Sequence, residues 1–276
     1  MANTSEGQPS ADQQELIYDW NTRGEQRALP AKIMFDDETL RACGRLIWAD
    51  RSGSRFVVGS QGVEYALVAH WRAEGLIAEK TEALSAGPVE RIAVVSGSCS
   101  PETAGQIAWA AERGFEPIRV DVARACDPQA WRTEIERSAK AAIEALGQGR
   151  DPILFSALGP DDQAVGNFND AVAASGQDRD IVNERVGTGL GAMLDSVLRI
   201  TGLNRCVIAG GDTSGHGALA LDLYALTAAA CTTPGAALCK AHSENSAYQD
   251  LEIALKGGQM GSPDYFGIIK QGGAAA

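Results

Sequence analysis

The sequence predicts an α/β protein built on a doubly wound, mostly parallel sheet with helices on both faces. Short, continuously apolar segments alternate with longer helical segments, and most of the apolar segments end in a turn that contains glycine or proline. Strands that are apolar throughout are typical of parallel sheets covered on both faces, and strand–helix alternation is typical of doubly wound folds. Of the 276 residues, 45% are hydrophobic, which is enough for a large core.

The first part of the chain predicts a flexible arm followed by a partial second α/β domain. Residues 1–29 are polar and show no sustained apolar period. The segments that follow predict a strand at Lys32–Phe35, a helix near Asp37–Ala49, a strand at Phe56–Val58 and a helix that ends near Glu74. Residues 79–88 contain serine, glycine and proline without a clear period, which is typical of a boundary. We therefore expect three parts: residues 1–29, 30–86 and 87–276.

The third part shows the strand–helix alternation most clearly. Strands are predicted at Ile92–Val95, Ile118–Val120, Ile153–Ser156 and Cys206–Ala209, and Leu251–Ala254 leads into a glycine-rich segment. Helices are predicted at Thr103–Arg113, Pro128–Leu146 and Glu184–Ile200, with a helix-forming segment at Ala218–Ala225. Gly114 and Gly202 suit the ends of two of these helices. The tail, Gly272–Ala276, is predicted to fray.

Composition and charge exclude several classes of protein. A formal net charge of -12 argues against a nucleic-acid partner or an anionic membrane, because both select basic surfaces. The longest apolar stretch, Ala218–Cys231, is too short to span a bilayer, and the polar N-terminus does not resemble a signal peptide. Six cysteines without C-x-x-C spacing are typical of reduced thiols. We therefore expect a soluble cytoplasmic protein.

Three glycine-rich turns follow predicted strands, at Gly59–Gly62, Ser96–Ser100 and Gly210–Gly215. In a parallel sheet the carboxyl ends of the strands lie on one edge, so these turns could converge on one site. Glycine lets the backbone approach a ligand closely, and the first amides of a helix bind phosphate well. A fourth cluster, Lys256–Gly261, could close over the same site. The pattern favours a nucleotide-type ligand.

Each of these signals also has a simpler interpretation. Ser98 and Ser100 could serve only as helix N-caps, and so could Asp212 and Thr213. The two adjacent glycines that precede Asp212 nevertheless exceed what a cap needs. Lys256 could neutralise a phosphate or lie solvated on the surface.

Other motifs are weaker or absent. Gly59–Gly62 is favoured slightly as a tight strand-to-helix turn. Gly187–Gly191 lies within a helical pattern, so close helix packing is favoured over a dinucleotide fingerprint. The sequence contains no P-loop, no protein-kinase motif set and no nucleophile elbow. His70, His216 and His242 are too scattered to indicate a zinc site.

Three segments together resemble the motifs of the four-carbon acid sugar kinase family. They are Ile92–Gln106 (IAVVSGSCSPETAGQ), Val207–Gly215 (VIAGGDTSG) and Leu255–Gly261 (LKGGQMG), in the order that the family shows. Pro234-Gly235, followed by Leu238-Cys239, is similar to the family's segment between the second and third motifs. The resemblance covers roughly residues 89–267, which correspond to the family's C-terminal nucleotide-binding domain.

The resemblance implies an ATP-dependent kinase that transfers the γ-phosphoryl group to a hydroxyl of a small acid sugar, such as threonate, erythronate or a 3-oxo-tetronate. It implies a nucleotide site formed by Ser98, Ser100, Gly210, Gly211, Asp212, Thr213, Lys256, Gly258 and Gly261. Gly210 to Thr213 would surround the phosphates, and Gly258 with its neighbours would complete the pocket. Asp212 would be the catalytic residue, either as a Mg²⁺ ligand through water or in deprotonation of the acceptor hydroxyl. Lys256 would add positive charge near the transferring group.

The chain also departs from the family pattern. The third motif usually resembles K-S-G-N-F-G, whereas Lys256-Gly-Gly-Gln-Met-Gly261 stands here, so backbone contacts carry over more safely than side-chain contacts. The N-terminal motif resembling Asp-Asp-Leu-Thr-Gly is absent, and residues 30–78 look like only the last part of the acid-sugar-binding domain.

These departures leave alternatives open. The chain could be a fragment, a split-gene product or a remnant. It could also be a nucleotide-binding module without independent catalysis, acting with a separate partner chain or as a degenerate remnant. A homo-oligomer is a further possibility. A third alternative, an NAD-dependent oxidoreductase, is disfavoured by the helical position of Gly187–Gly191.

Overall fold

The computed structural model describes residues 37–53, 56, 57, 59, 62–78, 85–233 and 236–273. The strand predicted at Lys32–Phe35 and the arm predicted over residues 1–29 lie outside this part. The chain forms two compact units, Met1–Thr81 and Glu82–Ala276, and each is treated by itself. The assignment of residues 30–86 to a remnant domain stays a prediction.

The described part of the first unit is a helical pair. Helix α2 spans Asp37–Ala49, as predicted, and helix α3 spans Gly62–Ala73, with the 3₁₀ turn η1 at Asp50–Ser52. The rings of Trp48 and Trp71 meet edge to face with centroids 5.3 Å apart. Phe56 and Val57 are exposed and lie in no strand, so the strand predicted there is wrong for these two residues. The described part of this unit contains no strand with which they could pair.

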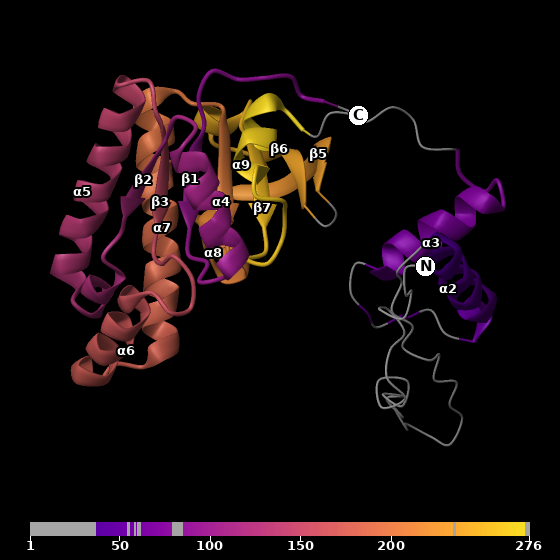
Figure 1. Cartoon of the computed structure of the whole chain (residues 1–276), viewed down its shortest axis with the longest axis horizontal. Coiled ribbons are helices and arrows are strands. Elements are labelled where there is room, and N and C mark those ends of the chain that lie inside the picture. Colours follow the sequence, from indigo (N-terminus) through magenta and orange to yellow (C-terminus); the bar gives the residue numbers. More distant parts are fainter. Residues whose placement is uncertain are drawn as a thin grey trace, which may run out of the picture. The chain divides into compact units, whose positions relative to one another are not determined.

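Seven strands form one sheet in the described residues of the second unit, in the order β2-β3-β1-β4-β7-β6-β5 (Figure 1). The bounds are β1 Ala93–Ser96, β2 Phe115–Arg119, β3 Asp151–Phe155, β4 Arg205–Ala209, β5 Leu223–Thr233, β6 Ala236–Ser243 and β7 Glu252–Lys256. The first five strands in the spatial order are parallel, and β6 pairs antiparallel with β7 on one side and with β5 on the other. Every residue of β1, β3 and β4 is buried. The predicted, mostly parallel α/β sheet is confirmed.

Helices cover both faces of this sheet. Helices α4 (Pro101–Ala111) and α9 (Tyr265–Gln271) bury their apolar residues in one cluster. Helices α5 (Pro128–Gly147), α6 (Gln163–Ser175) and α7 (Arg179–Thr201) contribute to the other, beside the short turns η2 (Val122–Cys126) and η3 (Ser246–Tyr248). Helix α8 (Gly211–Ala220) packs on the same face as this second cluster, against Ile208. Neighbouring residues of β1 separate the two clusters, since Val94 belongs to the first and Val95 to the second. This alternation follows from the two-residue period of a strand.

Several elements differ from their predictions. Helix α8 begins at Gly211 rather than Ala218, and Leu223–Ala225 belong to β5 rather than to a helix. The predicted glycine turn is thus the first part of a helix that packs closely, because a Cβ at Gly217 would lie 2.5 Å from Ile208 Cδ1. Gly272 and Gly273 are buried, so the frayed tail predicted from Gly272 onward is wrong for these two residues. The carbonyl of Gly272 accepts a hydrogen bond from the amide of Ala86 at 2.8 Å.

The glycines of helix α7 serve close helix packing, as predicted. A Cβ at Gly189 would lie 2.6 Å from Cε2 of Trp131, and one at Gly187 would lie 2.6 Å from Cδ2 of His216. A Cβ at Gly191 would lie 2.7 Å from that of Ala220. These positions bring α5 and α8 against α7, so they form no dinucleotide-binding turn.

All six cysteines are free. Among the residues that the structure describes, none of the helices has the length and apolar character needed to cross a membrane.

Candidate functional site

The site lies at the carboxyl edge of the sheet, between two neighbouring parallel strands. Ser96 at the end of β1 is in register with Ala209 at the end of β4. The chain leaves β1 for α4 on one face of the sheet, and it leaves β4 for α8 on the opposite face. Adjacent strands whose connections diverge in this way form the crevice in which doubly wound proteins bind ligands.

Backbone hydrogen bonds join three of the four glycine-rich segments at this edge. The amide of Gly97 donates to the carbonyl of Ala209 at 3.0 Å, and the amide of Gly210 donates to that of Lys256 at 2.9 Å. The segments after β1, β4 and β7 therefore meet, as the parallel sheet predicts. The fourth segment, Gly59–Gly62, belongs to the first unit.

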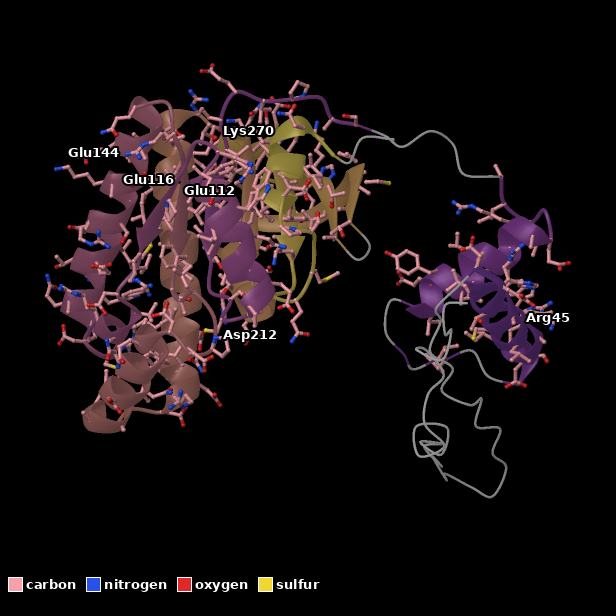
Figure 2. All side chains as sticks on the ribbon, viewed as in Figure 1. Arg45, Glu112, Glu116, Glu144, Asp212 and Lys270 are labelled. Carbon is pink, nitrogen blue, oxygen red and sulfur yellow. The ribbon has the colours of Figure 1, made fainter. Side chains whose placement is uncertain are left out.

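The N-terminus of helix α8 offers backbone amides to a ligand. Gly210 precedes the helix with φ at 118°, a conformation that favours glycine, and no side chain caps the helix there. Gly211 and Asp212 are exposed in its first turn. Asp212 is labelled in Figure 2. The first amides of a helix have no partner within the helix. An uncapped start with exposed residues suits an anion such as phosphate.

The segment after β1 packs closely against this helix. Thr213 is buried, and a Cβ at Gly97 would overlap its hydroxyl. A Cβ at Gly210 would lie 3.3 Å from the amide nitrogen of Ser98. Glycine at positions 97 and 210 therefore lets the segment after β1 pack closely against the start of α8.

Ser98 and Ser100, the two serines predicted for the site, make different contacts. Ser100 is the N-cap of α4, since its hydroxyl accepts a hydrogen bond from the amide of Thr103 at 3.1 Å. The capping interpretation is therefore confirmed for Ser100. Ser98 is buried, and its hydroxyl accepts from the amide of Ser100 at 3.2 Å. A Cβ at Gly258 would lie 2.5 Å from the Ser98 hydroxyl oxygen, so Ser98 lies where the segments after β1 and β7 meet.

Helix α4 holds residues 257–262, here called the β7 loop, through a stripe of polar side chains. Ser100 and Thr103 donate from their hydroxyls to the carbonyl of Gly258, at 2.5 and 2.8 Å. The Gln106 amide nitrogen, Nε2, lies 2.9, 3.0 and 3.1 Å from the carbonyl oxygens of Met260, Gly261 and Ser262. Gly261 takes φ at 91°, and a Cβ there would lie 3.0 Å from this nitrogen.

Thr103 and Gln106 are site residues that the sequence reasoning missed. Their signal is the three-residue spacing from Ser100, which places all three side chains on one face of a helix. What that face would bind was not visible in the sequence, because the β7 loop lies more than 150 positions away in the chain.

Lys256 at the end of β7 is buried, with 2% of its surface exposed. Its Nζ donates to Thr103 Oγ1 at 3.0 Å and to the carbonyls of Gly257 and Gly258 at 3.0 and 3.2 Å. Burial lowers its pKa to about 8, although the carboxylate of Glu102 acts in the opposite direction. The interpretation of Lys256 as a solvated surface lysine is therefore wrong.

The described residues contain no group of three or more His, Cys, Asp or Glu side chains that could hold a metal ion by themselves. Magnesium in nucleotide sites usually needs only one or two carboxylates, because substrate phosphates and waters supply its other ligands. Asp212, exposed beside the uncapped amides, fits that limited demand.

The sheet order and the helices on both of its faces define an α/β protein of the doubly wound class. The family described as "Nucleotide-binding C-terminal domain" matches residues 93–266, more than half of the chain. The chain belongs to this family, and the resemblance to the C-terminal domain of the four-carbon acid sugar kinases is confirmed.

Named relatives are kinases of sugar acids. A 3-oxo-isoapionate kinase of Paraburkholderia graminis is 44% identical over 239 residues, which cover 87% of this chain and 51% of that protein. A 3-oxo-tetronate kinase of Cupriavidus necator is 29% identical over 212 residues, which cover 76% of this chain and 45% of that protein. The chain thus spans about half the length of the relatives that it matches.

A crystal structure of the Haemophilus influenzae protein HI1011 shares the fold. It superposes with a TM-score of 0.59 at 22% identity, over 84% of this chain and 50% of that one.

Proposed function

We propose that this chain is the ATP-binding part of a sugar-acid kinase, which transfers the γ-phosphoryl group of ATP to a hydroxyl of a small acid sugar. The observation that carries the proposal is the uncapped start of α8 at the β1–β4 boundary, with Ser98 and Gly258 beside it. Kinase relatives of the 3-oxo-isoapionate and 3-oxo-tetronate type support the acid-sugar substrate class.

Backbone amides would make most of the contacts with the phosphates of the nucleotide. Phosphoryl transfer depends mainly on positioning and on neutralising charge. The amides of Gly211, Asp212 and Thr213 would hold the β- and γ-phosphates at the positive end of the α8 dipole. The hydroxyls of Ser98 and Thr213 would bind phosphate or ribose, and the β7 loop with Gly258 and Gly261 would close the site. Backbone amides bind phosphate without basic side chains, so the acidic composition is compatible with this role.

We assign Asp212 to Mg²⁺. When bound, the ion would neutralise charge on the β- and γ-phosphates, and Asp212 would hold one of its water ligands. The D212N variant is expected to bind ATP as the wild type does without Mg²⁺, and to lose at least tenfold of the affinity that Mg²⁺ adds. Calorimetric titration with and without Mg²⁺ measures this difference. Equal Mg²⁺ dependence in both proteins would leave deprotonation of the acceptor hydroxyl as the remaining role for Asp212.

The acid sugar is proposed to bind outside the described residues. The chain matches about half the length of its relatives, and the named kinases are longer proteins. Transfer would then require a domain that binds the acid sugar, which a separate partner chain could supply. No comparison favours the alternative of a nucleotide module without a catalytic role.

Calorimetric titration of the chain with Mg-ATP, and separately with NAD, tests the proposal. Mg-ATP is expected to bind and NAD is not. The G211V variant should fold but lose binding, because a Cβ at Gly211 meets no protein atom within 4 Å and would enter the space beside the amides. G215V is the matched control, since position 215 lies one turn further along α8 with equally open surroundings. A folded wild type without Mg-ATP binding, or equal loss in both variants, would contradict the proposed site.

A further inference from the structure

We propose that Lys256 is a positioning residue, whose buried ammonium group acts with Thr103 to fix the β7 loop over the nucleotide site without touching phosphate. That the β7 loop covers a nucleotide site rests on the proposed function, whereas the contacts of Lys256 are observed in the structure itself. It replaces the expectation that Lys256 supplies charge to the transferring group.

All three hydrogens of the ammonium group have acceptors inside the protein. The acceptors are the Thr103 hydroxyl and the carbonyls of Gly257 and Gly258, at 3.0, 3.0 and 3.2 Å from Nζ. Thr103 in turn donates to the carbonyl of Gly258 at 2.8 Å. An ammonium group is limited to three donors. A phosphate contact would therefore require breaking one of these bonds.

The direction of the side chain also separates Lys256 from the proposed phosphate site. Its neighbours Thr103 and Tyr265 come from α4 and α9, on one face of the sheet, and the ring of Tyr265 lies 5.9 Å from Nζ. Helix α8, whose first amides are proposed to hold phosphate, packs on the opposite face, against Ile208. The lysine reaches the nucleotide through the loop that it holds.

Burying an ammonium group inside a protein is unfavourable for the free energy of folding. Its transfer from water is strongly unfavourable unless hydrogen bonds compensate, and no salt bridge involves Lys256 among the described residues. The observed compensation consists of two loop carbonyls and one hydroxyl that itself binds the loop. The hydrogen bonds of the buried ammonium group therefore stabilise the conformation of the β7 loop.

This arrangement predicts two opposite effects of pH. The titratable groups that face Lys256 are Glu102 on α4 and Tyr265 on α9, and Cys239 on β6 lies near Tyr265. Burial lowers the pKa of Lys256 from 10.5 to about 8. Loop protection should fall as pH rises through about 8, because the neutral amine has one hydrogen fewer to donate. Over the same range the contribution of this group to folding should become more favourable, because the unfolded chain then binds more protons.

Amide hydrogen exchange of the nucleotide-free chain tests the loop directly. The variants K256M and T103V are expected to lower protection over residues 257–262 by about tenfold, with β1 and β4 unchanged. The double variant should lose no more than K256M alone, because both side chains act on the same contact. K240M is the matched control, since that lysine on β6 has a side chain that is 52% exposed. Unchanged protection in both single variants would overturn the inference.

Mg-ATP affinity then separates positioning from direct contact. Positioning predicts that K256M and T103V weaken binding by similar factors, and that wild-type affinity falls above pH 8 while that of K256M stays level. Full affinity in T103V with more than tenfold loss in K256M would mean that the ammonium group contacts phosphate. If wild type binds no Mg-ATP but both variants still loosen the loop, the proposed function fails and the role of Lys256 in holding the loop stands.

Discussion

At the residue scale, glycines on α7 matter because the side chains of neighbouring helices occupy the space beside them. The G189A variant would place a Cβ 2.6 Å from Cε2 of Trp131, and this overlap forces the ring or the helix to move. Overpacking of this kind costs about 1–3 kcal/mol, so we expect the midpoint of urea unfolding to fall. G166A on α6 is the control. Its nearest neighbour is 3.5 Å away, and we expect a gain of about 0.5–1 kcal/mol. Equal effects in the two variants would contradict the packing argument.

The buried carboxylate of Glu134 is expected to make the stability of the fold depend on pH in the acid range. This carboxylate accepts hydrogen bonds from Arg137, from the amide of Asp121 and from Ser138. Burial alone would raise the pKa of Glu134, but these partners outweigh it and lower the pKa below its ordinary value of 4.5. The stabilisation is therefore complete above about pH 4.5 and is lost as pH falls through the lowered pKa. The stability difference between wild type and E134Q should shrink from pH 6 to pH 3 in denaturant titrations. E136Q, at an exposed position of the same helix, should show no such trend.

At the residue scale, the sequence could predict only features that depend on neighbours along the chain. The cap at Ser100 and the packing glycines of α7 follow from neighbours along the chain. The burial of Lys256 and the carbonyl partners of Gln106 depend on a loop that is distant in sequence, and no periodicity marks that contact.

At the element scale, helix α9 is fastened to the sheet by buried charges. The ammonium group of Lys270 pairs with Asp151 at 2.5 Å, and Asp151 also accepts from the amide of Ile92. Arg205 donates to the carbonyls of Gly87, Ile269 and Lys270 and pairs with Glu252. These bonds join α9 to the segment that leads into β1.

The K270M variant should therefore destabilise the second unit strongly. Asp151 is 1% exposed and would lose its ammonium partner inside the protein. Breaking a buried pair in this way costs about 3–5 kcal/mol. K140M is the control, because Lys140 and Glu144 are both exposed on α5 at 3.8 Å and such pairs contribute about 0.3–0.5 kcal/mol. Thermal unfolding of both variants measures the difference, and similar midpoints would refute the fastening role.

The elements that the sequence predicted best are those buried on both faces. Strands β1, β3 and β4 are apolar at nearly every position, so composition alone marked them. The start of α8 was misplaced because its glycines are poor helix formers, and tertiary packing against Ile208 and α7 overrides that preference. Strand β5 was missed because it lies at the sheet edge with most residues exposed, which removes the alternation that marks a strand.

At the scale of the whole molecule, the sequence predicted the family and the meeting of the three motifs at one edge of the sheet, because the motifs follow the three neighbouring parallel strands β1, β4 and β7. The lack of a clear period over residues 79–88 predicted a boundary there, and the division between the compact units after Thr81 lies within this range. The exact position of the division follows only from the contacts within each unit.

The two units should respond differently to nucleotide. A ligand that binds one folded unit stabilises that unit by mass action, by about 2.7 kcal/mol at a hundred times its Kd. For a unit the size of Glu82–Ala276, this corresponds to a rise in Tm of about 5–10 °C. Scanning calorimetry is expected to show two transitions, with Mg-ATP raising only the larger one and G211V removing that rise. A single transition that shifts as a whole would instead mean that the helical pair α2–α3 unfolds together with the nucleotide-binding sheet.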